Sequence, residues 1–211
     1  LTASRSNLFL DLDGTILSTK ERCARVFCDL LGIPPKSFID DYISKREQGE
    51  SNSEIIRNGN FSPTSSTGEF SSKWMNAIEA PEYLKYDALL DGVKPWLEAQ
   101  KADFNLHVCT NRQNGMRTLA QLRRLGILGY FDEVLVTHQV MSKSNLIRST
   151  VPSVTSDDWM IGDSIEDIRE GKKIKLQTCA VLTGFAGVST LSRERPDRIV
   201  RSLDYLSFAN S

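Results

Sequence analysis

Histidine and cysteine are scarce in this sequence, and neither type is clustered. The 211 residues include two His and four Cys, and no two Cys form a Cys-x-x-Cys pair. Structural zinc sites use clustered Cys and His ligands, so this composition argues against such a site. Four scattered cysteines are typical of reduced thiols in a cytosolic protein, so we expect a cytoplasmic location rather than a disulfide framework.

Long apolar runs and an excess of charge are also missing. No apolar stretch approaches the roughly 18 residues of a membrane-spanning helix. The first segment, LTASRSNLFLDLDG, lacks the basic start and apolar run of a secretory signal. The formal net charge is -1, whereas domains that bind nucleic acids usually present a basic face. We therefore expect neither a membrane nor a nucleic acid as a partner, and the sequence does not reveal the oligomeric state.

Short apolar segments alternate with helical patterns along most of the chain. The first, at residues 7–10, runs directly into an Asp-Leu-Asp-Gly turn and predicts a buried strand. Further strands are predicted at 105–110, 133–137, 159–161 and 178–182, and helices at 93–101, 114–125, 142–149 and 165–173. Strands that alternate with helices of this length predict βαβ units, and hence an α/β fold with a parallel sheet.

A block of helical patterns interrupts this alternation after the first strand. Apolar residues recur at helical spacing in 23–31 and again in 70–78, and the polar segment 58–72 predicts a loop. We therefore predict two domains: an α/β core of residues 1–17 and 89–211, and a helical cap of residues 18–88.

Polar side chains follow the ends of four predicted strands. Asp11 and Asp13 come after the first, Thr110-Asn111-Arg112 after the second, Lys143 after the third, and Asp163 and Asp167 after the fourth. In open α/β sheets, ligands bind at the edge where the strands have their carboxyl ends. We therefore expect these side chains to meet in one site, with Arg112 either facing the substrate or lying in a solvated loop.

The acidic members of this set predict a magnesium site. Several carboxylates near one point repel one another, and their burial is tolerable only with a cation among them. Oxygen ligands suit Mg²⁺, which is typically held by one or two carboxylates together with a substrate phosphate. Lys143 and Thr110 add the positive charge and the hydroxyl donor that a phosphate group binds.

The same residues predict covalent phosphoryl transfer. With a cation and Lys143 to offset the repulsion between two anions, Asp11 can attack phosphorus. Asp13 can protonate the leaving oxygen and then deprotonate a water molecule. The expected reaction is hydrolysis of a small phosphomonoester, and the expected partner is a small phosphorylated metabolite.

Taken in order, these motifs resemble those of the haloacid dehalogenase superfamily, in particular its phosphatases of the phosphoglycolate phosphatase and β-phosphoglucomutase type. The DxDGT motif is Asp11 to Thr15, the Thr-Asn motif is Thr110-Asn111, the single Lys is Lys143, and GDSxxD runs from Gly162 to Asp167. The resemblance implies a doubly wound, Rossmann-like parallel-sheet core with an inserted α-helical cap.

The resemblance also implies a role for each matching residue. Asp11 would carry an aspartyl-phosphate, and Asp13 would act as general acid and base. Mg²⁺ would be held by the Asp11 carboxylate, the Asp13 backbone carbonyl and Asp163. Asp167 would be a further ligand or an outer partner, a place that Glu166 could also take. The phosphate group would be bound by Thr110, Asn111 and Lys143.

Two other functions share these motifs and stay open. A phosphosugar mutase of the β-phosphoglucomutase type would form the same intermediate, but such mutases usually carry a His twelve residues after the nucleophile, where this chain has Cys23. A non-catalytic phosphate-binding relative would be expected to have degenerate motifs, and these are intact. Asp13 argues against a dehalogenase, because those members replace this residue. The substrate itself cannot be read from the sequence.

One departure from the family pattern concerns local structure. Members normally have a small residue and Gly before the fifth strand, whereas this chain has Ile174-Lys175. We therefore expect an unusual turn at this point.

Overall fold

The computed structural model describes residues 5–59, 61, 67–151 and 153–208. The chain forms two compact units, one made of Leu1–Ser18 with Leu89–Ser211 and the other of Thr19–Ala88. We call the first the α/β unit and the second the helical unit.

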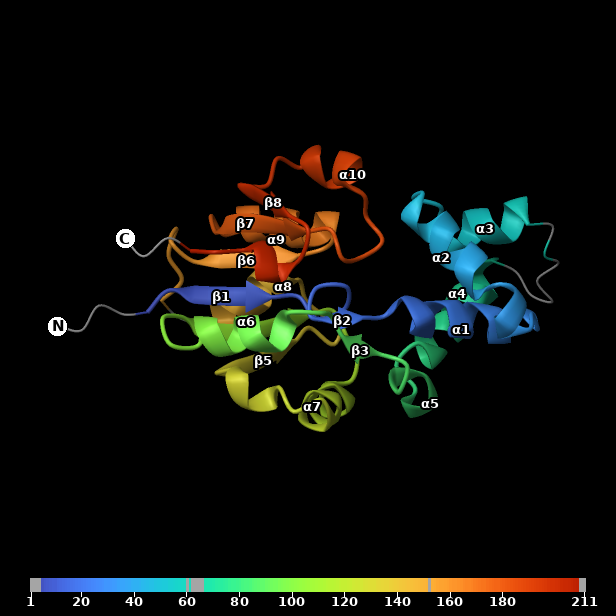
Figure 1. Cartoon of the computed structure of the whole chain (residues 1–211), viewed down its shortest axis with the longest axis horizontal. Helices are drawn as coiled ribbons and strands as arrows, with labels where there is room; N and C mark the ends of the chain where they lie inside the picture. The colour runs from blue at the N-terminus through green and yellow to red at the C-terminus, as the bar shows by residue number, and fades with distance from the viewer. Residues whose placement is uncertain (1–4, 60, 62–66, 152, 209–211) are drawn as a thin grey trace. The chain divides into compact units, whose positions relative to one another are not determined.

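The α/β unit is built on a six-stranded parallel sheet (Figure 1). In spatial order its strands are β5 (Glu133–Val136), β4 (Asn105–Thr110), β1 (Asn7–Leu10), β6 (Trp159–Gly162), β7 (Gln177–Val181) and β8 (Arg198–Val200). The chain winds outward from β1 in one direction and then in the other, which is the doubly wound arrangement. The predicted fold class is therefore confirmed, and within this sheet only the short edge strand β8 has no counterpart among the predicted strands.

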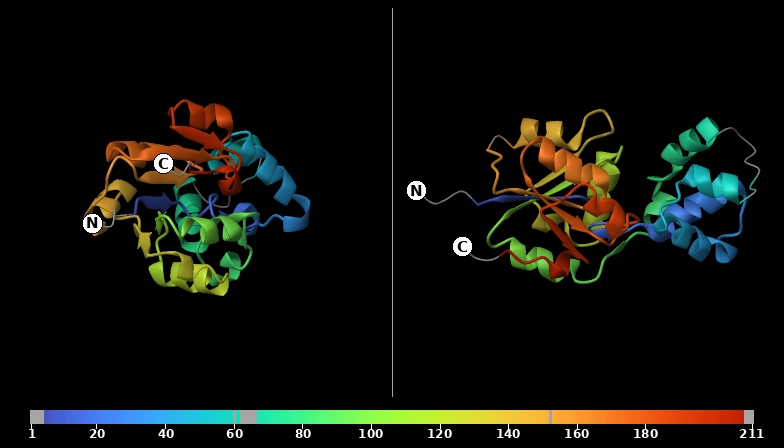
Figure 2. Two further views of the ribbon diagram at one scale, coloured as in Figure 1. Left: turned by 60° about the vertical axis from the view of Figure 1, so that its left-hand side comes forward. Right: turned by 90° about the horizontal axis from the view of Figure 1, so that it is seen from above.

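Helices cover both faces of this sheet. They are α6 (Val93–Gln100), α7 (Gly115–Arg124), α8 (Lys143–Thr150) and α9 (Ile165–Lys173). Leu8 and Leu10 pack in one hydrophobic cluster with Leu97 of α6, whereas Phe9 packs in another with Ile147 of α8. The split follows from the alternation of side chains along a strand. Figure 2 shows α8 and α9 on the side of the sheet opposite α6.

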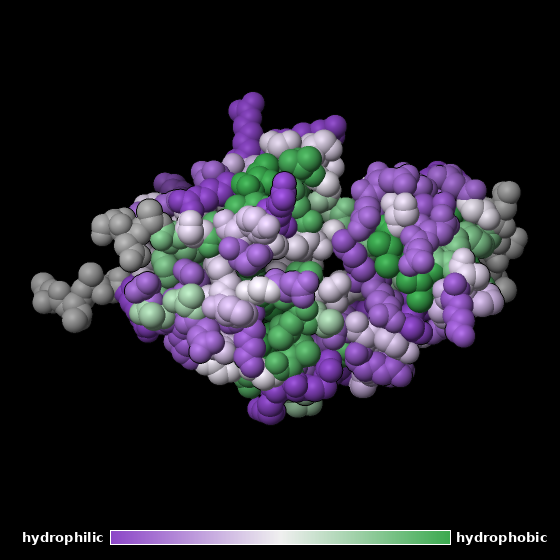
Figure 3. All heavy atoms as spheres, in the orientation of Figure 1, coloured by the Kyte–Doolittle hydropathy of each residue, from purple (hydrophilic) through white to green (hydrophobic). Residues whose placement is uncertain are grey.

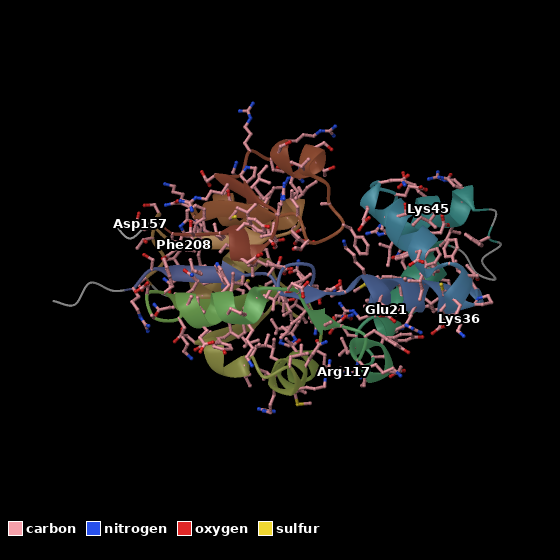
Figure 4. The ribbon with its side chains drawn as sticks, in the orientation of Figure 1. Glu21, Lys36, Lys45, Arg117, Asp157 and Phe208 are labelled. Carbon is pink, nitrogen blue, oxygen red and sulfur yellow. The ribbon has the colours of Figure 1, made fainter. Side chains whose placement is uncertain are left out.

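The last described segment closes the same core. It begins after η3 (Leu203–Tyr205), which is one of three short elements of this unit. The other two are η2 (Leu128–Tyr130) and α10 (Val188–Ser192). The indole N–H of Trp96 donates to the backbone carbonyl of Leu206 at 2.8 Å, and the ring of Phe208, labelled in Figure 4, lies 5.4 Å from that of Trp159. These contacts hold the C-terminal segment against α6 and β6.

The turn between α9 and β7 has the unusual conformation that the sequence predicts. Lys175 has a φ of 63°, in the left-handed region where Gly is the common residue after a helix. Its neighbours Ile174 and Leu176 are buried in the cluster of Phe9. Burial of these two side chains offsets the strain, which for a non-Gly residue is of order 1–2 kcal/mol.

The chain passes between the two units at β2 (Leu17–Ser18) and β3 (Ala88–Leu89), which pair in a separate two-stranded sheet. Strands of two residues leave no periodic pattern in a sequence, and neither strand was predicted.

The helical unit consists of short helices around aromatic side chains. They are α1 (Lys20–Leu31), η1 (Pro35–Ser37), α2 (Ile39–Glu47), α3 (Asn52–Asn58), α4 (Thr67–Ala77) and α5 (Pro81–Leu84). The ring of Phe27 on α1 is 4.8 Å from that of Tyr42 and 5.8 Å from that of Phe70, so α1, α2 and α4 share one core.

The predicted loop at 58–72 is wrong over its last part, because α4 already begins at Thr67. Burial of Phe70 and the i,i+4 ion pair between Lys73 and Glu69 stabilise this helix despite its polar sequence. Residues 60 and 62–66 of the predicted loop lie outside the described part of the chain.

The surfaces of both units carry many hydrophilic residues on the face seen in Figure 3. In the helical unit Lys45 pairs with Asp41 and Arg25 with Glu21, and Figure 4 labels one member of each pair. Among the helices of the described residues, none combines the length and the apolar character needed to cross a membrane.

Candidate active site

Asp11 is the first residue after β1, at the carboxyl edge of the sheet. Its backbone N–H donates to the carbonyl of Ile161 at 2.8 Å, which continues the pairing of β1 with β6. Because β1 lies where the strand order reverses, Asp11 occupies the position at which doubly wound sheets bind ligands. Its carboxyl group is largely buried.

Lys143 joins two of the predicted carboxylates. It is the first residue of α8, and its buried Nζ donates to Oδ1 of Asp11 and, at 2.6 Å, to Oδ1 of Asp167. Burial alone would lower the pKa of Lys143, but the two carboxylates raise it well above its usual 10.5. The side chain therefore keeps its positive charge inside the site.

Three carboxylates form a cluster around this lysine. Asp11, Asp163 and Asp167 each offer an oxygen, and these oxygens lie within 4.8 Å of one another. Burial raises the pKa of Asp11 to about 7; Lys143 opposes this shift and Asp167 adds to it. Burial and the charges of Asp11 and Asp167 likewise raise the pKa of Asp163 well above 3.8. Full ionisation of the cluster is thus unfavourable unless further positive charge is present.

Two glycines and a threonine hydroxyl lie against the carboxylate of Asp163. A Cβ atom on Gly14 would lie 2.4 Å from Oδ2 of Asp163, and one on Gly184 only 1.7 Å from it. The Thr15 hydroxyl donates to Oδ1 of Asp163 at 3.3 Å, and the Thr183 hydroxyl donates to the Gly14 carbonyl at 2.5 Å. The loops after β1 and β7 therefore close together around this carboxylate.

Asp167 is held by the first turn of its own helix. The backbone N–H and hydroxyl of Ser164 donate to Oδ2 of Asp167 at 3.1 and 2.6 Å, while the N–H of Asp167 donates back to Ser164. This reciprocal capping explains the Ser and the second Asp of GDSxxD in local terms. Glu166 is exposed, so Asp167 and not Glu166 lies in the cluster.

Asp13 turns its carboxylate toward Arg112, and it is not a member of the described carboxylate cluster. Arg112 Nε donates to Oδ2 of Asp13 at 2.9 Å, and Nη2 donates to Oδ1 at 2.6 Å. The Arg112 side chain is 3% exposed, so its interpretation as a solvated loop residue is wrong. The metal-ligand role of the Asp13 backbone carbonyl stays a prediction.

The predicted phosphate-binding pair follows β4, the neighbour of β1. Thr110 is the buried last residue of that strand, and Oδ1 of Asn111 accepts a hydrogen bond from the Thr137 hydroxyl at 3.1 Å. Val108 is paired with Leu10, so Thr110 lies level with the loop that contains Asp11 and Asp13. The roles of Thr110 and Asn111 stay predictions.

Glu170 supports the site and was missed by sequence reasoning. Its buried Oε2 accepts from the N–H of Ser144 at 3.0 Å and from the Ser144 hydroxyl at 2.7 Å. This contact ties α9 to the first turn of α8, which carries Lys143. In a sequence, a Glu on an amphipathic helix is expected at the surface. No sequence signal distinguishes Glu170 from such a surface residue.

Comparisons with known proteins agree with this architecture. A model of the haloacid dehalogenase-like hydrolase family matches residues 8–181. The pyrophosphatase PpaX of Listeria monocytogenes is 23% identical over 217 residues, covering 98% of this chain and 96% of that protein. The chain is also similar to the structure of a predicted phosphoglycolate phosphatase from Haemophilus somnus, with a TM-score of 0.72 and 16% identity over 96% of both chains.

A second solved structure was obtained with magnesium. YfnB of Bacillus subtilis, for which an interdomain movement is described in the magnesium-bound form, superposes with a TM-score of 0.66 and 19% identity, over 95% of this chain and 96% of that one. These similarities confirm the fold independently of the site.

Proposed function

This chain belongs to the haloacid dehalogenase-like hydrolase family, and from that premise we propose that it is a Mg²⁺-dependent phosphatase of small phosphomonoesters. One observation carries the proposal: Lys143 donates to Asp11 and Asp167, and Asp163 lies beside them. The buried lysine charge and three carboxylates are therefore grouped at the carboxyl edge of the sheet. This grouping suits a phosphoryl group bound between a lysine and a divalent ion.

The residues present fit Mg²⁺. Asp11 and Asp163 supply the all-oxygen donors that this ion prefers, and their raised pKa values reflect a charge cost that a divalent cation would relieve. Asp11, Asp163 and the Asp13 carbonyl would hold the ion, with Asp167 orienting Lys143 from beside it. When bound, the ion polarises the phosphoryl oxygens and offsets the repulsion between two anions. The magnesium-bound structure of YfnB supports this assignment.

The first half-reaction transfers the phosphoryl group to the protein. The substrate phosphate is bound by Lys143, Thr110 and Asn111, and a carboxylate oxygen of Asp11 attacks phosphorus. The bond from phosphorus to the ester oxygen breaks as the new bond to Asp11 forms. Asp13 gives its proton to the departing oxygen, so the alcohol leaves neutral.

The second half-reaction releases phosphate. Asp13, now a carboxylate, takes a proton from a water molecule as that water attacks phosphorus. The bond between phosphorus and Asp11 breaks, and inorganic phosphate leaves with the carboxylates of Asp11 and Asp13 in their starting states.

We assign the choice of substrate to the helical unit, Thr19–Ala88, as a cap that excludes bulk water during the reaction. The movement described for YfnB supports such a role. The four cysteines are free thiols, which supports the expected cytoplasmic location.

The test is a phosphate-release assay over a panel of small esters in Mg²⁺ or in a chelator. The panel includes phosphoglycolate, sugar phosphates and nucleotides, and also pyrophosphate because of the relative PpaX. We expect release from at least one substrate, dependence on Mg²⁺, and a loss of about a thousandfold or more in Asp11→Asn. Glu166→Gln, a change at an exposed neighbour of Asp167, is the matched control and should keep full activity.

Two outcomes would contradict the proposal. Turnover that survives in Asp11→Asn removes the nucleophile from the scheme. Isomerisation of a sugar phosphate without net release of inorganic phosphate would identify a mutase instead.

A further inference from the structure

Arg112 links Asp13 to α7 through one buried guanidinium group. Its Nε and Nη2 donate to the two carboxylate oxygens of Asp13, at 2.9 and 2.6 Å. On its other side, Nη1 donates to Oε1 of Gln121, a buried residue of α7. Arg112 follows β4 and Asp13 follows β1, so the contact spans two neighbouring strands.

The geometry restrains the carboxylate more than a single contact would. The planar fork of an arginine matches the two oxygens of a carboxylate, which fixes both the distance and the plane of the group. The Gln121 oxygen holds the guanidinium from behind. The Asp13 carboxylate therefore has a defined orientation relative to Arg112.

The exposure of the two partners differs in a way that suits catalysis. The Arg112 side chain is 3% exposed, but that of Asp13 is 29% exposed. A buried charge is costly unless it is paired, and the Asp13 carboxylate pairs with the buried guanidinium of Arg112. Asp13 stays accessible to a water molecule or a leaving group while it is held.

We propose that Arg112, itself held by Gln121, is the positioning residue for Asp13. This inference rests on the proposed function, because it concerns the acid and base of that reaction. The guanidinium fixes the orientation of the carboxylate that takes a proton from water when the aspartyl-phosphate is hydrolysed. Loss of Arg112 should therefore slow the second half-reaction more than the first when the leaving group needs no proton.

The experiment separates the two half-reactions with p-nitrophenyl phosphate. Nitrophenolate is a good leaving group, so the first turnover reports formation of the phosphoenzyme and the steady state reports its hydrolysis. In Arg112→Ala we expect kcat to fall about 10- to 100-fold, part of the 10²–10⁴ that acid–base catalysis supplies. KM and the first-turnover rate should change by less than about threefold, so that a burst of nitrophenolate appears.

Three variants guard against a merely structural explanation. Arg112→Lys keeps a positive charge and should recover part of kcat, and Gln121→Ala should show a weaker form of the same burst. Arg123→Ala, which removes an exposed arginine of α7, should behave as wild type.

The outcomes distinguish the inference from its premise. Equal slowing of the first turnover and the steady state, an unchanged kcat in Arg112→Ala, or no recovery in Arg112→Lys would overturn the role of Arg112 while wild-type turnover still depends on Asp11. Wild-type protein without Asp11-dependent turnover would instead overturn the proposed function.

Discussion

The carboxylate of Asp163 lies so close to the backbone of Gly184 that a Cβ atom there would be 1.7 Å from its Oδ2. The loop after β7 therefore helps to place a residue that follows β6, and only a residue without a side chain fits. In our proposal Asp163 is a metal ligand, and support around such a ligand commonly contributes 10- to 100-fold to metal affinity.

We predict that Gly184→Ala weakens Mg²⁺ binding by about tenfold or more, because Asp163 must move away from the cluster. Titration calorimetry with Mg²⁺ measures the change. The matched control is Gly187→Ala in the same loop, where a Cβ would meet nothing within 4 Å. Equal Mg²⁺ affinity in the two variants would show that Asp163 does not need this enclosure.

Asp163→Asn should change stability in opposite directions with and without metal. The folded protein raises the pKa of Asp163, through burial and the charges of Asp11 and Asp167, so its ionisation destabilises the metal-free fold above the ordinary pKa of 3.8. In a chelator near neutral pH, the variant should be more stable than wild type, because Asn carries no charge that the metal-free site must accommodate.

In Mg²⁺ the order should reverse. At about a hundred times its dissociation constant, Mg²⁺ stabilises wild type by about 2.7 kcal/mol, and the variant should gain little of this. Urea unfolding in the two buffers measures both effects. A variant that is less stable than wild type in the chelator would show that the cluster does not carry the expected charge cost.

Glu170 should make stability depend on pH in the acid range. Burial alone would raise its pKa, but hydrogen bonds from Lys173 and Ser144 outweigh burial and lower the pKa from 4.5 to about 2. A carboxyl group with a lowered folded pKa stabilises the fold above its unfolded pKa, and this contribution is lost as pH falls from 4.5 toward 2.

Glu170→Gln removes the charge that these donors require. We expect a loss of about 1–3 kcal/mol in the free energy of unfolding near neutral pH, with the gap to wild type closing as the pH falls through this range. Urea unfolding of both proteins across the range measures the gap. A gap that is constant with pH would mean that the carboxylate charge is not what holds α8.

The sequence predicts those parts of the site that depend on chain-local chemistry. Asp11 follows the apolar strand β1 and Asp163 follows the apolar strand β6, so secondary structure alone brings them to the same sheet edge. The α/β alternation places strands β1, β4, β5, β6 and β7 for the same reason, because each contains a short, mainly apolar segment between helical patterns.

The sequence does not predict contacts that depend on tertiary neighbours. From the sequence, Arg112 could equally face the substrate or lie in a solvated loop, and Glu170 looks like an ordinary surface charge. The fold places Asp13 beside Arg112 and Ser144 beside Glu170. The edge strand β8 has exposed residues and lacks the apolar run of a buried strand. In α4 the apolar spacing from Phe70 predicts the helix, but its start at Thr67 lies in a polar segment that was predicted as a loop.

The helical unit contains a buried ion pair whose loss should be costly. Nε of Arg22, in the first turn of α1, lies 3.1 Å from Oδ1 of Asp87, just before β3. The side chain of Arg22 is 3% exposed and that of Asp87 is 0% exposed. Removal of one partner of a buried ion pair is strongly destabilising, so Asp87→Asn should cost about 3 kcal/mol in unfolding free energy. The exposed pair of Lys45 and Asp41 is the control, and Lys45→Ala should cost less than about 0.5 kcal/mol.

A double variant tests the physical reason for this cost. Replacing Arg22 by Met together with Asp87 by Leu removes both charges, and exchange of a buried pair for apolar side chains of similar volume is often neutral or stabilising. We therefore expect the double variant to recover most of the stability that Asp87→Asn loses. Urea unfolding followed by tryptophan fluorescence measures the free energy of unfolding of wild type, Asp87→Asn, Lys45→Ala and the double variant. If the double variant is as unstable as Asp87→Asn, the pair acts through its geometry at the base of α1, and the cost of an uncompensated charge is not the cause.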